Sequence, residues 1–216
     1  MELKGRVINV LGDSITEGVG ASCTANRFTD VLWREYGLKA VNNYGISGSR
    51  IARQRKMTAE PHERWFASRI GEMDPSADAV VVFGGTNDYG HGDAPLGTFE
   101  DRTVDTFYGA CHVLMQGLME KYTGKPVVIL TPLHRDEEMN PHDERKDEVH
   151  PLQVYRSILM EVAAHYAFPV LDLYAASGIQ PQNAVCRERL CPDGLHPSDE
   201  GHAIIARRIG EFLKML

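Results

Sequence analysis

Long apolar segments are missing from this sequence. No stretch approaches the roughly 18 consecutive apolar residues that a membrane-spanning helix requires, so we expect no membrane insertion. The N-terminus also lacks the apolar segment and small-residue cleavage site of a secretory signal, because a strand-like run begins as early as Val7. We therefore expect a cytoplasmic protein, unless a leader has been removed from the chain.

Positive charge is also scarce. The chain has 23 lysines and arginines against 30 aspartates and glutamates, which gives a formal net charge of −7. Because binding to a phosphate backbone requires a basic face, we expect no nucleic-acid partner. No feature of the sequence specifies an oligomeric state.

Cysteines are few, and their spacing fits no zinc-binding motif. The four are Cys23, Cys111, Cys186 and Cys191. Cys186 and Cys191 are close enough in the sequence to form a local disulfide in an oxidising compartment. Free thiols in a reducing compartment are the favoured interpretation.

What the chain does have is the composition of a folded globular protein. It has 216 residues, of which 43% are hydrophobic and 25% are charged, and it shows no internal repeat. We expect a single domain over residues 1–216. Five short apolar runs, several of them rich in Val and Ile, predict buried strands at 6–11, 39–44, 79–84, 126–131 and 169–172. Continuous rather than alternating apolar runs are typical of parallel strands that are covered on both faces.

Segments with helical spacing of apolar residues separate these strands. They lie at 26–36, 63–72, 103–122, 152–166 and 199–216. Ser198 is the expected N-cap of the last one. Strands that alternate with helices predict an α/β fold: a three-layer α/β/α domain around a central, mainly parallel five-stranded sheet, wound as in flavodoxins. Its site should lie beyond the carboxyl ends of the strands.

Chemically useful residues follow three of the predicted strands at this edge. Ser14 comes just after the first strand, Gly48 after the second and Asn87 after the third. A serine in this position is a candidate nucleophile, and a glycine N–H and an asparagine amide are candidate donors to an oxyanion. Each feature also has a simpler explanation, as a helix cap or a turn.

A fourth motif, Asp193-Gly194-Leu195-His196-Pro197, follows the fifth strand. Asp193 and His196 are close enough to meet, with the carboxylate accepting the imidazole Nδ1–H. Nε2 then stays free to take a proton from a serine.

Together the four motifs resemble those of the GDSL esterases and lipases, also called SGNH hydrolases. The matching segments are Gly12-Asp13-Ser14-Ile15-Thr16, Asn43-Tyr44-Gly45-Ile46-Ser47-Gly48, Gly85-Thr86-Asn87-Asp88 and Asp193-Gly194-Leu195-His196-Pro197. Ile15 stands where the family name has Leu. The resemblance implies that Ser14 is the nucleophile, His196 the base and Asp193 its orienting partner. It also implies an oxyanion hole made by the backbone N–H groups of Ser14 and Gly48 and the Asn87 amide.

The same resemblance implies hydrolysis of a small-molecule ester through an acyl-enzyme, with no metal and no organic cofactor. Two other interpretations remain open. Asp193, His196, Asp199 and His202 recur every three residues, as in a metal site of a metal-dependent deacetylase or phosphoesterase, although Pro197 interrupts the run. A non-catalytic binding domain on the same fold is the second.

The substrate is the least specified part of the prediction. The family resemblance allows acetylated sugars, other short-chain esters, lysophospholipids and thioesters. A strongly charged loop at 133–150 disfavours an apolar channel for long acyl chains. Two interpretations of this loop stay open: it borders the site, or it is a solvated excursion. The basic residues Arg50, Arg53, Arg55 and Lys56 either bind a leaving group or, more simply, form a solvated helix face. We expect a short acyl group, such as acetyl, on a carbohydrate or another polar alcohol.

Overall fold

A computed structural model of the protein describes residues 1–140 and 148–216. Its five strands form one sheet in the order β2-β1-β3-β4-β5, and every neighbouring pair is parallel. The strands are β1 (Val7–Gly12), β2 (Ala40–Gly45), β3 (Ala79–Phe83), β4 (Val127–Leu130) and β5 (Val170–Leu171). Each predicted strand is confirmed, and its ends differ from those observed by one residue at most.

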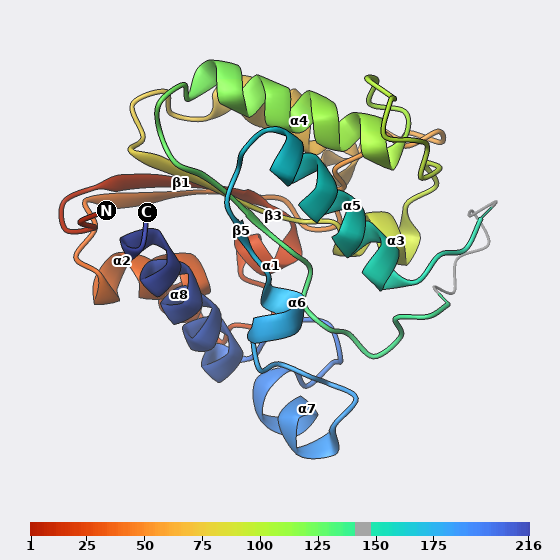
Figure 1. Ribbon diagram of the computed structural model, residues 1–216. Coiled ribbons are helices and arrows are strands. Elements are labelled where there is room, and N and C mark those ends of the chain that lie inside the picture. Colours follow the sequence, from red (N-terminus) through yellow and green to blue (C-terminus); the bar gives the residue numbers. More distant parts are fainter. Residues whose placement is uncertain (141–147) are drawn as a thin grey trace.

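Helices cover both faces of this sheet, which confirms the three-layer prediction. The α-helices are α1 (Ser14–Glu17), α2 (Phe28–Glu35), α3 (Thr86–His91), α4 (Phe107–Lys121), α5 (Leu152–His165), α6 (Leu173–Ala176), α7 (Ala184–Leu190) and α8 (Asp199–Lys214). Short 3₁₀ helices are η1 (Thr24–Asn26), η2 (Pro61–Glu63) and η3 (Phe66–Glu72). Figure 1 shows α4 and α5 on one side of the sheet and α2 and α8 on the other.

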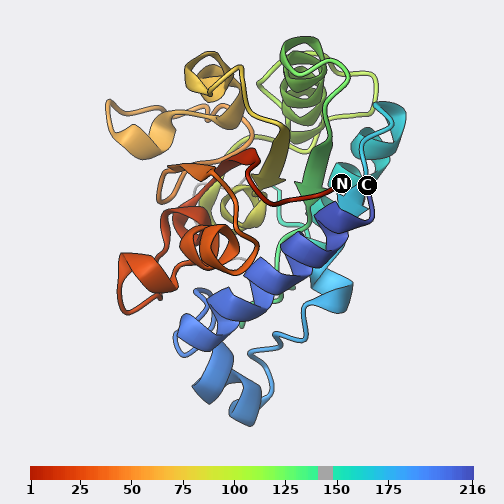
Figure 2. The same ribbon diagram turned by 90° about the vertical axis from the view of Figure 1, so that its left-hand side faces the viewer.

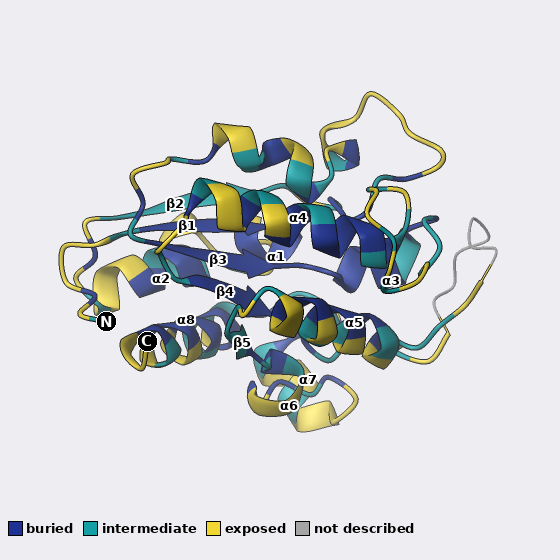
Figure 3. Ribbon diagram, turned by 45° about the horizontal axis from the view of Figure 1, so that its top comes forward, coloured by how far each residue is buried: buried dark blue, intermediate teal, exposed yellow. Residues whose placement is uncertain are grey.

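The central strands are apolar on both faces because both faces are covered. In β3, Val80 and Val82 pack in the core under α4 and α5, whereas the alternate residue Val81 packs in the core with α2 and α8. Strands of this kind show no polar alternation. Figure 3 shows β1, β3 and β4 as buried, while the edge strand β2 is only partly covered.

Several helix boundaries differ from the predictions. The segment 63–72 forms the 3₁₀ helix η3, with bonds such as Met73 N–H to the Ile70 carbonyl at 3.2 Å, rather than an α-helix. Helix α4 begins at Phe107 and not at residue 103, because the Thr106 side chain caps it by accepting the Gly109 N–H at 3.1 Å. The expected cap of α8 is observed, since Ser198 Oγ accepts the Gly201 N–H. Helices α3, α6 and α7 were not predicted.

The two ends of the chain lie side by side, as Figure 2 shows. The N-terminal ammonium donates to the carbonyls of Leu213 at 3.1 Å and Lys214 at 3.0 Å, near the end of α8. All four cysteines are free thiols. Within residues 1–140 and 148–216, no helix has the length and apolarity needed to cross a membrane.

The strand order determines where loops gather. From β1 the chain crosses to β2 on one side and then returns to pair β3 with the other side of β1. The carboxyl ends of β1 and β3 therefore flank a reversal in strand order, where ligands bind in open α/β sheets. Ser14 and Asn87 follow these two ends.

Candidate active site

Ser14 lies at the start of α1, directly beyond β1. The preceding Asp13 caps this short helix, with its Oδ1 accepting the Ile15 N–H at 3.0 Å. The Asp13 carboxyl is buried, and burial raises its pKa to about 7 in spite of the hydrogen bond from Ile15. The cap fixes the turn that carries Ser14, which lines a surface pocket.

His196 approaches Ser14 from the loop between α7 and α8. Its Nε2 lies 2.9 Å from Ser14 Oγ, and its Nδ1 lies 2.7 Å from Asp193 Oδ2. The other oxygen of Asp193 accepts the backbone N–H groups of Leu195 at 2.9 Å and His196 at 2.6 Å. Partial burial raises the pKa of Asp193, but these hydrogen bonds outweigh it and hold the pKa below its ordinary value.

This geometry assigns the protons of the imidazole. An ionised carboxylate can only accept, so Nδ1 carries the proton and donates it to Asp193. Nε2 is then an acceptor for the Ser14 hydroxyl. The arrangement can remove a proton from Ser14 as its oxygen attacks an electrophile, and can return that proton to a leaving group.

Gly48 and Asn87 face Ser14 across the same pocket. Gly48 has a φ of +75°, a left-handed conformation that favours glycine. The Asn87 amide is held at both ends: Nδ2 donates to the Ser49 carbonyl at 3.1 Å, and Oδ1 accepts from His91 Nε2 at 3.1 Å. The second hydrogen of Nδ2 stays available to a substrate.

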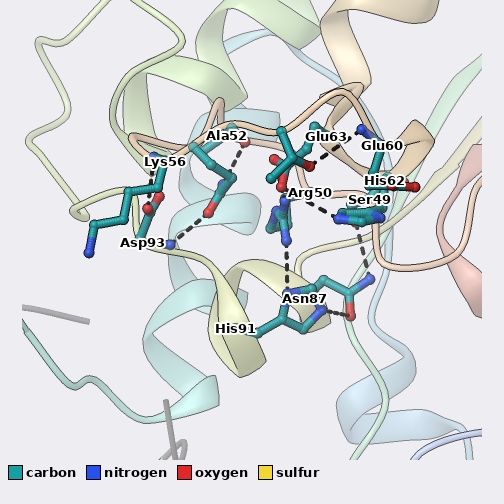
Figure 4. Close-up of polar contacts among 12 residues, drawn as sticks. Ser49, Arg50, Ala52, Lys56, Glu60, His62, Glu63, Asn87, His91 and Asp93 are labelled. Atoms are coloured by element: carbon teal, nitrogen blue, oxygen red, sulfur yellow. Dashed lines mark hydrogen bonds and ion pairs between the residues drawn. The ribbon is translucent and has the colours of Figure 1, made fainter. Parts of the chain in front are cut away.

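A buried ion pair supports His91 from behind. Arg50 Nη1 lies 2.8 Å from His91 Nδ1, and Arg50 Nη2 donates to Glu63 Oε2 at 2.6 Å. The Arg50 and Glu63 side chains are only 3% and 6% exposed. Figure 4 shows the resulting chain of contacts, from Glu63 through Arg50 and His91 to Asn87. Because a guanidinium only donates, His91 must accept at Nδ1 and donate from Nε2, which fixes the orientation of the Asn87 amide.

Two further buried side chains, Asp88 and Arg69, hold the segment after Gly48 in place by hydrogen bonds, and Arg69 also bonds to strand β1. Asp88 accepts the backbone N–H groups of Ile51 and Ala52, both at 2.9 Å. Arg69 Nη2 donates to the Gly12 carbonyl at 3.1 Å and to Ser49 Oγ at 3.0 Å. Burial lowers the pKa of Arg69 to about 10. The sequence analysis assigned no role to Arg69, Asp88, Glu63 or His91, and only the adjacency of Asp88 to Asn87 could have indicated one.

Contrary to our expectation, the basic cluster after Gly48 is not helical, and only part of it is solvated: Arg55 and Lys56 are exposed, whereas Arg50 is buried. Its members are Arg50, Arg53, Arg55 and Lys56. The segment is irregular, because the Asp93 carboxylate accepts two of its successive backbone N–H groups, at 2.7 and 3.0 Å. Arg50 is buried against Glu63 and holds His91, so it supports the pocket and does not face solvent.

The pocket has a volume of about 350 Å³. Its lining consists of Ser14, Val19, Ser47, Gly48, Asn87, His91, Arg135, Leu195 and His196. All the candidate residues of the four motifs therefore meet here except Asp193, which lies behind His196. Arg135 belongs to the charged loop at 133–150, so the described part of that loop borders the pocket. Residues 141–147 of the loop lie outside the described residues.

The residues of the alternative metal site have other partners. His202 is buried, with Nδ1 accepting the Phe28 N–H at 3.2 Å and Nε2 bonded to the Val19 carbonyl at 3.2 Å. Asp199 accepts the backbone N–H and hydroxyl of Ser22. In the described part of the chain, no three His, Cys, Asp or Glu side chains form a group that could hold a metal ion. Only Asp199 and His202 lie on α8, whereas Asp193 and His196 precede it and contact each other and Ser14.

A family model for the GDSL-like lipases and acylhydrolases matches residues 10–204. The chain belongs to this family. Its members are acylhydrolases, and the interval matched includes Ser14, Asn87 and His196. A comparison with curated protein sequences finds no match.

Solved structures share the fold of this GDSL-like protein over its whole length. One crystal structure is 33% identical, with a TM-score of 0.85, and the alignment covers 100% of this chain and 99% of the other. A protein from Lactobacillus plantarum is 29% identical, with a TM-score of 0.84 and coverage of 99% and 98%. A chain described as a possible lipase from Chitinophaga pinensis is 20% identical, with a TM-score of 0.68 and coverage of 97% and 98%.

Proposed function

We propose that this GDSL-like acylhydrolase is a serine esterase that works through an acyl-enzyme. The observation that carries the proposal is the 2.9 Å hydrogen bond between Ser14 Oγ and His196 Nε2, with Asp193 on the far side of the ring. His196 takes the hydroxyl proton while Ser14 Oγ bonds to the ester carbonyl carbon. The carbon–oxygen bond to the alcohol then breaks, and the alcohol leaves with the proton from His196.

Deacylation follows the same route with water in place of serine. His196 takes a proton from water, the hydroxide adds to the acyl carbon, and Ser14 recovers its proton as the acid leaves. In both halves the negative charge on the carbonyl oxygen is stabilised by the N–H groups of Ser14 and Gly48 and by Asn87 Nδ2. Donors of this kind stabilise the transition state because they are already oriented toward the developing charge.

We further propose a short acyl group, such as acetyl, on a polar alcohol or carbohydrate. The modest pocket volume of about 350 Å³ and the presence of Asn87, Arg135 and Ser47 in its lining support this choice. A long acyl chain would need a longer apolar groove. The acyl specificity and the cytoplasmic location remain predictions.

Replacement of the nucleophile tests the mechanism. We expect Ser14→Ala to lower kcat for p-nitrophenyl acetate by about 10⁴-fold or more. The matched control is Ser157→Ala, which removes an exposed hydroxyl on α5 and should keep wild-type kcat. A series of esters from acetate to palmitate then tests the acyl preference, which should decline with chain length. Full turnover by a folded Ser14→Ala protein, with or without a chelator, contradicts the serine mechanism.

A further inference from the structure

Arg135 places a guanidinium in the lining of the proposed catalytic pocket. The residue follows β4, and its Nη1 donates to the Thr86 carbonyl at 3.1 Å and to Thr86 Oγ1 at 3.2 Å. Its guanidinium carbon also lies 5.2 Å from the centre of the Tyr89 ring. These contacts hold the charge over the first turn of α3, one residue from Asn87.

The backbone at Gly90 leaves room for the Arg135 guanidinium. A Cβ at Gly90 would lie 2.7 Å from Arg135 Nη1, so a side chain there would displace the guanidinium. The backbone N–H of Arg135 donates to Glu138 Oε1 at 2.9 Å, which anchors the loop that carries it. Arg135 is thus fixed from three directions.

Among residues 1–140 and 148–216, no carboxylate forms an ion pair with Arg135 within 4 Å. Of the acids that follow it in the loop, Glu138 binds His134 and Tyr174, each at 2.7 Å, and Asp136 pairs with Arg187 at 2.7 Å. Glu137 and Glu138 attract the guanidinium through space only. Of the residues that line the pocket, Arg135 alone carries a permanent charge. Partial burial lowers the pKa of its guanidinium, and this effect outweighs the attraction of Glu137 and Glu138, which raises it.

The remaining N–H donors of the guanidinium indicate which chemical group Arg135 can bind. Arginine has five N–H donors, and Thr86 accepts those of Nη1. Nε and Nη2 have no hydrogen-bond partner among residues 1–140 and 148–216, and this pair of parallel donors matches the two oxygens of a carboxylate or phosphate.

We propose that Arg135 binds an anionic group of the ester, so that the substrates are esters that carry a carboxylate or phosphate near the scissile bond. This inference rests on the proposed esterase function. The anion belongs either to the acyl part or to the alcohol part, and both would bring the same chemistry to Arg135.

Two matched pairs of esters distinguish these sources. The acyl pair is 4-nitrophenyl hemisuccinate and 4-nitrophenyl pentanoate, and the alcohol pair is 4-acetoxybenzoate and its methyl ester. In each pair the measured quantity is kcat/KM for the anionic ester divided by kcat/KM for the neutral one. We expect wild type to favour the anionic member of one pair, and the preference to weaken with added salt.

Substitution of Arg135 should abolish this preference. We expect Arg135→Gln to lower the anionic-to-neutral ratio by about 10- to 100-fold, while the neutral ester keeps most of its kcat/KM. Arg135→Lys should retain part of the preference, because it keeps the charge but loses the paired donors. The control is Arg189→Gln, which removes an exposed charge paired with Glu200 and should leave both ratios unchanged.

The outcomes separate this inference from the esterase proposal. If Arg135→Gln loses the preference for the anionic ester only in the acyl pair, the anion belongs to the acyl part. If it loses the preference only in the alcohol pair, the anion belongs to the alcohol part. Wild type that prefers the neutral ester in both pairs, or Arg135→Gln with unchanged ratios, overturns the role of Arg135. Hydrolysis of the neutral esters by Ser14→Ala instead overturns the esterase mechanism, whatever the ratios.

Discussion

The two sides of the pocket are built in opposite ways. On one side, Asp193 and His196 are three residues apart in a loop, and their side chains are 56% and 18% exposed. On the other side, Asn87 depends on His91, Arg50 and Glu63, which come from separate segments, and the Arg50–Glu63 pair is almost completely buried.

This difference matches what each side is proposed to do. A general base must take up and release protons in every cycle. Its carboxylate partner only orients the imidazole, so it does not have to be buried. A donor to an oxyanion acts by its fixed direction, which requires a rigid support. A buried ion pair provides rigidity but costs desolvation energy, and removal of one partner leaves an uncompensated charge. We therefore expect substitutions on the exposed side to affect rate alone, and those on the buried side to affect both rate and stability.

The largest effect on rate is expected from His196→Ala. Without the base, kcat for p-nitrophenyl acetate should fall by about 10⁴-fold or more. Because the ring lies on a partly exposed loop, the free energy of unfolding should change by about 0.5 kcal/mol or less. Steady-state kinetics and urea denaturation measure the two quantities. A large loss of stability would remove the contrast between the two sides.

A smaller loss of rate but a larger loss of stability is expected from Asn87→Ala. Removal of one oxyanion donor should lower kcat by about 10²- to 10³-fold. The substitution also leaves the Ser49 carbonyl and His91 Nε2 without their Asn87 partner, and an unsatisfied buried polar group costs about 1–3 kcal/mol. The same two measurements apply. Wild-type stability in Asn87→Ala would show that the buried network does not depend on this amide.

Much of the fold was predictable, because the signals were local. The continuous apolar runs that became β3 and β4 gave both the strands and their burial, and Ser198 marked the start of α8. The same holds for the short motif that joins Asp193 to His196. The contact of Ser14 with His196 was expected from the family resemblance, because His196 lies in the loop between α7 and α8 and not at the end of a strand.

The buried support of Asn87 was not predictable in this way. Arg50 lies among other basic residues, and such a cluster ordinarily indicates a solvated surface. Only the tertiary structure brings Glu63 to Arg50 and turns the pair toward His91. Likewise, 3₁₀ helix η3 has apolar residues at helical spacing, and tertiary contacts rather than that pattern decided its conformation. Polar contacts between distant segments have no periodic signal in a sequence.

The smallest effect on rate is expected at His91, whose proposed role is to orient the Asn87 amide. We infer that His91→Ala lowers kcat by about 10-fold, since one hydrogen bond that orients the amide is lost while the amide itself remains. His91→Gln should restore most of kcat, because a glutamine amide can accept from Arg50 and donate to Asn87 Oδ1 as the imidazole does. KM should change less than kcat in both variants, since the oxyanion forms only in the transition state. The control is His165→Ala in the last turn of α5, an exposed residue outside the pocket, and this variant should have wild-type kcat. Equal kcat in the alanine and glutamine variants would mean that His91 supports the fold but does not orient Asn87.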